Sequence, residues 1–139
     1  MSGILYILFP CVAYACVATQ SSTATPSLRN CPSCDVSTLS GSTFTPTTSD
    51  TPGTAYFLRG VDPTNWCDTA QVNCLSADGA TVTVRIDIVI DGTSTQISSG
   101  CSEVHSIANL LQCNSNNQWT YNDRTDFTVQ CHSLTTSTC

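Results

Sequence analysis

Two cysteines spaced for redox chemistry stand near the start of the cysteine-rich part of the chain. Cys31 and Cys34 form a C-x-x-C motif, a spacing that can favour a reactive thiolate and thiol exchange. A redox site of this kind needs a strand before the motif and an amphipathic helix after it, and neither pattern flanks these cysteines. Zinc binding would need a second ligand pair, and His105 and His132 do not form one. We therefore interpret Cys31 and Cys34 as structural half-cystines, each bonded to another cysteine.

The remaining reactive side chains do not form a recognisable catalytic set. Asp87 and Asp91 are four residues apart, and Asp123 and Asp126 are three apart, but such carboxylates usually solvate a surface. No G-x-S-x-G motif occurs, and two isolated histidines do not support a Ser/His/Asp triad. The sequence predicts a protein that is not an enzyme and has no catalytic, cofactor-binding or metal-binding residues.

Two tryptophans offer a different kind of chemistry, because an exposed indole can serve as a ligand platform. Trp66 precedes a cysteine and Trp119 falls within a predicted strand. Indoles in such places more often pack against a disulfide. We expect both side chains to be packed in this way.

The first 18 residues have the pattern of an export signal. Residues 4–18 carry no charge and are shorter than the roughly 20 residues that a membrane-spanning helix needs. Small residues at Cys16 and Ala18 predict cleavage after Ala18. An uncleaved membrane anchor and a lipoprotein are the alternatives. We expect a secreted, extracellular protein whose mature form has no membrane association.

The composition of the chain limits the classes of partner that it can bind and the number of domains that it can form. The chain has 139 residues, a net charge of -6, four arginines and no lysine, so a surface for nucleic acid or anionic lipid is not expected. A Ser/Thr-rich leader at 19–30 precedes one predicted domain at 31–139. The expected partner is an extracellular protein or a glycan of unknown identity, and no cofactor is expected.

Cleavage after Ala18 leaves an even number of cysteines in an oxidising compartment, which favours a framework of four structural disulfides. Eight cysteines allow 105 pairings, so their spacing alone does not decide which bonds form. The eight predicted half-cystines are Cys31, Cys34, Cys67, Cys74, Cys101, Cys113, Cys131 and Cys139.

Short runs of alternating residues, separated by turn residues, predict an all-β fold, specifically a small disulfide-rich antiparallel β-sandwich. The strongest run is 80–90, which alternates strictly and ends at Asp91-Gly92, the signature of a tight hairpin. Residues 103–111 fit either a helix or an irregular strand, and we predict a strand. The other predicted strands are 55–61, 68–74, 93–98, 118–121 and 125–131, and the predicted core is Val82, Val84, Ile86, Ile88, Ile90, Tyr56, Leu58, Val72, Trp119, Phe127 and Val129.

The Ser/Thr-rich residues 37–54 lack apolar periodicity and predict a long loop or a weak edge strand. This stretch and the leader at 19–30 either carry O-linked sugar or are bare solvated segments. No Asn-x-Ser/Thr acceptor occurs, so ordinary N-glycosylation is not expected.

The cysteine motifs together resemble the six-cysteine (C-six) domain of nematode secreted proteins. The resemblance covers residues 31–131 and rests on the C-x-x-C motif, the C-x6-C segment at 67–74, the segment C-N-x-x-x-Q-W-x-Y at 113–121, and residues 127–131. It implies an extracellular domain of uncharacterised biochemical function, without catalytic residues to transfer.

The resemblance also bears on disulfide pairing. Some members of the family lack the first and third cysteines together, which implies that these two are bonded. The fifth and eighth cysteines of the mature chain depart from the six-cysteine pattern, and we expect them to bond to each other. The resemblance therefore implies the bridges Cys31–Cys67 and Cys101–Cys139. Four cysteines remain to form two more bridges, which we predict to be Cys74–Cys113 and Cys34–Cys131.

Two classes of function fit these patterns. The first is a secreted, non-catalytic extracellular interaction or structural module with an unknown ligand. The second is a secreted effector, such as a protease inhibitor or a host-directed protein, since small disulfide-rich scaffolds are common among these. An inhibitor would present an exposed loop bearing Arg or a large apolar residue, and the candidate, residues 58–60, falls in a predicted strand.

Overall fold

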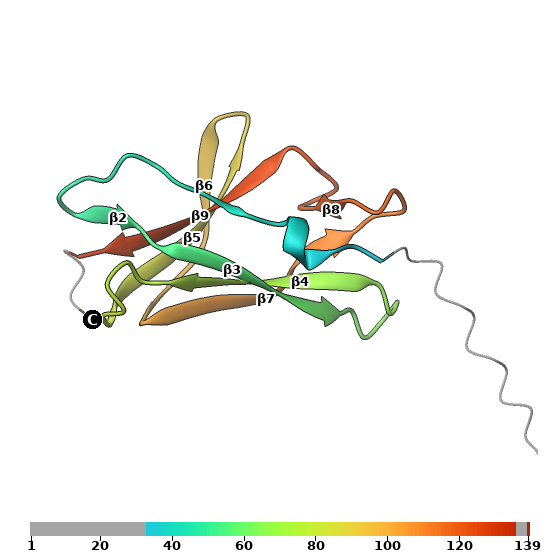
Figure 1. Ribbon diagram of the computed structural model, residues 1–139, viewed down its shortest axis with the longest axis horizontal. Coiled ribbons are helices and arrows are strands. Elements are labelled where there is room, and N and C mark those ends of the chain that lie inside the picture. The colour runs from blue at the N-terminus through green and yellow to red at the C-terminus, as the bar shows by residue number, and fades with distance from the viewer. Residues whose placement is uncertain (1–32, 136–138) are drawn as a thin grey trace, which may run out of the picture.

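A computed structural model describes residues 33–135 and Cys139, which form two packed β-sheets (Figure 1). In chain order the elements are the 3-10 helix η1 (Val36–Thr38) and strands β1 (Gly41–Ser42), β2 (Asp50–Pro52), β3 (Thr54–Val61), β4 (Asp68–Leu75), β5 (Val82–Ile90), β6 (Thr93–Ser102), β7 (Val104–Cys113), β8 (Trp119–Thr120) and β9 (Phe127–Leu134). No helix among these residues is long and apolar enough to span a membrane.

The two sheets form the layers of the sandwich. One sheet has the order β1-β9-β5-β6, with β2 also paired to β9, and the other has the order β3-β4-β7-β8. Every strand pair in them is antiparallel except β1 with β9, which is parallel. The predicted fold class, a small disulfide-rich antiparallel β-sandwich, is confirmed.

Strand β5 supplies the centre of the core. Val84, Ile86 and Ile88 alternate along it and are fully buried or nearly so, as the period-two pattern predicts. At its end Asp91 and Gly92 both have positive φ, 52° and 75°, which a type I′ turn requires at its two central positions. The hairpin of β5 and β6 is therefore encoded locally, by one alternating run and one turn.

Strand β7 includes most of residues 103–111, whose apolar spacing also fits a helix. Its pairing with β4 shifts register between Ala70 and Val72, and Asn109 there has a φ of 54°. Between the pairs Ala70–Leu111 and Val72–Ile107, β7 has two more residues than β4, and Ile107 and Leu111 both pack against the core. A spacing of four between apolar residues is thus compatible with a strand, because residues i and i+4 lie on the same face of it.

Strand β3 departs from the predicted core. Tyr56 and Leu58 are 39% and 50% exposed, whereas Ala55 and Phe57 pack against the core. Prediction of Tyr56 and Leu58 as core residues was therefore wrong. The run 55–58 is apolar throughout, so it contains no alternation that tells which face of an edge strand is buried.

Gly53 lies where the chain passes from β2 in one sheet to β3 in the other. Its backbone N–H donates to the carbonyl oxygen of Cys131 at 2.9 Å. A Cβ atom at this position would lie 2.5 Å from the carbonyl oxygen of Leu75, which is backbone and cannot rotate away. The corner between the sheets therefore requires glycine.

We expect Gly53→Ala to lower the free energy of unfolding by about 2 kcal/mol or more, since the strand must move to relieve the clash. Gly92→Ala is the matched control, because a Cβ there meets no atom within 4 Å and only the positive φ opposes it, at about 1 kcal/mol. Urea denaturation of both variants measures the difference. A smaller loss for Gly53→Ala than for Gly92→Ala would contradict the close approach.

Candidate functional site

Three disulfides join distant parts of the described chain: Cys34–Cys113, Cys74–Cys131 and Cys101–Cys139. The last agrees with the predicted pairing. Cys67 is also disulfide-bonded, while Cys31, its predicted partner, lies outside the described residues.

Two predicted pairings, Cys74–Cys113 and Cys34–Cys131, were wrong. The same four cysteines form the bonds Cys34–Cys113 and Cys74–Cys131 instead. On β7, the residue opposite Cys74 is His105, and Cys113 lies eight residues further along the strand. Eight residues of strand span roughly 26 Å, far beyond the reach of a disulfide. Cys74 bonds instead to Cys131 and so connects β4 of one sheet to β9 of the other.

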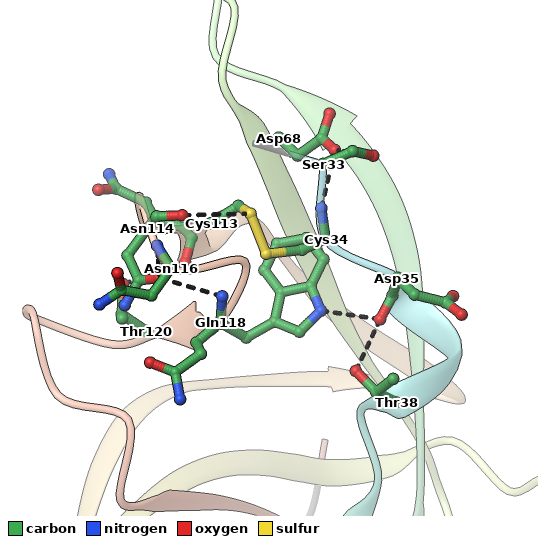
Figure 2. Close-up of a disulfide and its surroundings, with 12 residues drawn as sticks. Ser33, Cys34, Asp35, Thr38, Asp68, Cys113, Asn114, Asn116, Gln118 and Thr120 are labelled. Carbon is green, nitrogen blue, oxygen red and sulfur yellow. Dashed lines mark hydrogen bonds between the residues drawn. A yellow bond between two sulfur atoms is a disulfide. The ribbon is translucent and has the colours of Figure 1, made fainter. Parts of the chain in front are cut away.

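The Cys34–Cys113 bond fixes the N-terminal segment against the end of β7 (Figure 2). Asp35 caps η1 by accepting a hydrogen bond from the backbone N–H of Ser37 at 2.9 Å. The indole N–H of Trp119 donates to the carbonyl oxygen of Asp35 at 3.0 Å, and Trp119 lies directly opposite Cys113 in the β7–β8 pair. The predicted packing thus holds for Trp119, whereas Trp66 is 61% exposed and departs from it.

A buried carboxylate, Asp68, reinforces the same segment. It accepts hydrogen bonds from the hydroxyl of Ser33 at 3.0 Å, the backbone N–H of Cys34 at 3.3 Å, and the guanidinium of Arg59 at 2.8 Å. Burial acts to raise the pKa of Asp68, but the hydrogen bonds from Arg59 and Ser33, with the charge of Arg59, outweigh it and lower the pKa. Asp68 is therefore a charged tether between β4 and the segment that contains Cys34.

We expect Asp68→Asn to lose about 2 kcal/mol of stability at neutral pH, because the amide has no charge to pair with Arg59 and replaces one acceptor oxygen with an NH2 group that faces other donors. The lowered pKa means that the carboxylate stabilises the fold above its unfolded pKa of about 4, and that this contribution is lost as pH falls through the folded pKa. Urea denaturation of both proteins should show a constant difference from pH 7 to 5 that shrinks below pH 4. A difference independent of pH would contradict this role.

Asn114 organises the turn between β7 and β8. Its side-chain oxygen accepts from the backbone N–H groups of Asn116 at 2.9 Å and Gln118 at 3.0 Å (Figure 2). Asn117 adopts a positive φ of 59°, which asparagine tolerates better than most residues. The Asn and Gln of the C-N-x-x-x-Q-W segment are thus part of a rigid turn, a role that the sequence analysis did not assign.

A polar cluster covers part of the outer face of the five-stranded sheet. His132 Nδ1 lies 2.9 Å from an oxygen of Asp50, and Arg85 pairs with Asp87 at 2.8 Å. Asp87, predicted to be a solvated surface residue, is only 3% exposed, because neighbouring side chains cover it. Phe44 stacks on the imidazole of His132 with ring centroids 4.1 Å apart and helps to shield it from water. We interpret this cluster as structural.

The other carboxylates singled out by spacing do not assemble a site. Asp91 and Asp126 both pair with Arg124 on the exposed surface. Hydrogen bonds from Arg124 lower the pKa of Asp126, as expected for a solvated ion pair. Among residues 33–135 and Cys139, no group of three or more His, Cys, Asp or Glu side chains is arranged to hold a metal ion.

A groove opens beside the turn organised by Asn114. It encloses about 370 Å³, within the range of roughly 300 to 1,000 Å³ typical of small-ligand sites. Its lining comes from η1 and the residues that follow it, from the β7–β8 turn, and from the start of β9. The lining residues are Thr38, Leu39, Ser40, Asn117, Gln118, Trp119, Thr125, Phe127, Thr128 and Val129.

Fold and site together define a disulfide-cross-linked β-sandwich with a polar groove beside one of its disulfides. Over 74 residues, 53% of this chain, it is 64% identical to the whole length of an uncharacterised protein of Caenorhabditis elegans. The chain therefore belongs to the same family as that nematode protein. No family model matches the chain, and no solved structure matches it.

Proposed function

We propose that this protein is a secreted, non-catalytic extracellular interaction module of the kind found in the nematode six-cysteine domains. The observation that carries the proposal is the disulfide framework, which connects the two sheets and fixes both ends of the described chain. Such cross-links persist in oxidising compartments and are rare where thiols are kept reduced. A charge-free stretch at residues 4–18 supports export, and the groove offers a place for a ligand.

The alternative of a secreted protease inhibitor finds less support. Its candidate loop, residues 58–60, belongs to β3 and pairs in register with β4. The guanidinium of Arg59 is 48% exposed but is paired with the buried carboxylate of Asp68, and a protease would have to break this pair to bind it. An interaction module without inhibitory activity is the better account of this geometry.

Export and oxidation are tested by expressing the full chain in a eukaryotic secretory host. We expect the secreted protein to begin at Thr19 and, after allowance for glycans, to weigh eight hydrogen atoms less than its fully reduced form. Intact mass spectrometry with and without reduction measures both. The control lacks residues 2–18 and should remain in the cell. Retention of the full chain, or free thiols at several cysteines, would contradict the proposal.

A further inference from the structure

The groove lacks charge although the chain is strongly acidic. None of its ten lining residues is Asp, Glu, Lys, Arg or His, while the protein has a net charge of -6. A charged ligand would find no opposite charge in the lining and would lose its own hydration on entering. The lining therefore suits a neutral ligand.

Several lining side chains are available to bond such a ligand. Ser40, Asn117, Gln118 and Thr125 are exposed, and within the described part of the chain their side chains make no hydrogen bond. Each amide offers donors and an acceptor, and each hydroxyl offers both, so the set can bond hydroxyl groups in either direction. In Figure 2 the side chain of Gln118 points away from the disulfide.

Apolar atoms complete the lining. Phe127 and Leu39 are partly buried, and Trp119 and Val129 are buried, so apolar surface is available between the polar groups. A sugar ring has hydroxyls at its edge and C–H groups on its faces, which matches this mixture. An extended peptide would instead need separate apolar pockets for alternate side chains, and the exposed lining residues here are polar.

The walls of the groove are held in place before any ligand binds. Asn114 fixes the turn that presents Asn117 and Gln118, and the Cys34–Cys113 bond anchors the segment that leads into η1. The bond from Trp119 to Asp35 connects these two walls. A pre-organised site loses little conformational entropy on binding. This favours the binding of ligands, such as sugars, that are held by individually weak hydrogen bonds.

We propose that this groove binds a neutral carbohydrate of one or two rings. The inference rests on the proposed function as an interaction module and names its ligand class. Gln118 supplies an amide to a ring hydroxyl from one wall, Ser40 a hydroxyl from the other, and Phe127 contacts a ring face.

The test titrates the secreted, oxidised protein with four neutral disaccharides (chitobiose, cellobiose, lactose and maltose) at millimolar concentrations. A sulfated heparin disaccharide and an uncharged extended peptide serve as comparison ligands. Amide chemical shifts in two-dimensional NMR report both affinity and location. We expect at least one neutral disaccharide to bind and to shift the resonances of residues 38–40 and 117–119, and the other two ligands to leave them unchanged.

Paired variants locate the site. Gln118→Ala should lower the affinity for the disaccharide about fivefold, the effect of one lost hydrogen bond, and Ser40→Ala should also lower it. The matched control is Gln71→Ala on β4, outside the groove, which should leave the affinity unchanged. Because only the backbone of Gln118 bonds to Asn114, the variant should keep its turn, and an unchanged unfolding midpoint verifies this.

Three results would overturn the inference: no disaccharide in the panel binds, affinity is unaffected by both groove variants, or the peptide or sulfated sugar binds the groove in preference. Failure here is distinguishable from failure of the proposed function. A protein that is secreted and fully oxidised but binds no sugar remains an extracellular module with a different ligand.

Discussion

Removing the disulfide between the sheets, with the double variant Cys74→Ala/Cys131→Ala, is expected to lower the free energy of unfolding by about 5 kcal/mol. The bond joins residues 57 apart in sequence, and the chain-entropy model assigns about 4 kcal/mol to a loop of that length. Both cysteines are buried, at 0% and 2% exposure, so loss of their sulfur atoms adds roughly 1 kcal/mol from packing. Such a loss equals the whole net stability of many small domains.

A second double variant, Cys101→Ala/Cys139→Ala, separates chain entropy from packing. It removes a bond between residues 38 apart, for which the same model gives nearly the same entropy, about 4 kcal/mol. Cys101 is exposed, so little packing is lost with it. Urea denaturation of both variants measures the difference. If the Cys74/Cys131 variant loses no more unfolding free energy than the Cys101/Cys139 variant, burial of the bond between the sheets does not contribute to stability.

The fold was predictable where a local pattern determines the structure. Strand β5 alternates from Val82 to Ile88, and its turn residues have one common geometry, so the strand and its hairpin follow from a single segment. Strand β3 has no alternation, and its buried face is decided by how it pairs with β4 and packs on the other sheet. Tyr56 and Leu58 were misplaced because that information is not local.

Disulfide pairing and the groove depend on contacts between distant segments. Cys74 and Cys131 meet because β4 and β9 belong to opposite sheets, which no spacing between cysteines encodes. Residues 38–40, 117–119 and 127–129 line one groove although they are up to about 90 residues apart. A sequence signal did exist for one wall: Asn114 and Asn117 are residue types that favour tight turns.

Replacing Ile86 with Asp tests the core assignment most directly, and we expect a loss of about 3 kcal/mol or more. Ile86 is fully buried at the centre of β5, and its neighbour across the strand pair is Cys131 of the disulfide between the sheets. A carboxylate there would have to remain charged without a partner or take up a proton, and both outcomes destabilise the fold. Chemical denaturation with the disulfides intact isolates this effect from cross-linking.

Thr95→Asp provides the matched control in the adjacent strand. Thr95 is exposed on β6, which pairs directly with β5, so the same carboxylate is added to the same sheet but remains in water. We expect its change in unfolding free energy to stay within about 1 kcal/mol. Strand β5 keeps one register with β9 from Thr83 to Ile90, while its pairing with β6 shifts between Ile86 and Asp87. A slip of β5 by one residue against β9 would expose its whole apolar face. If both variants lose similar stability, Ile86 does not face the core and the β5 register is wrong.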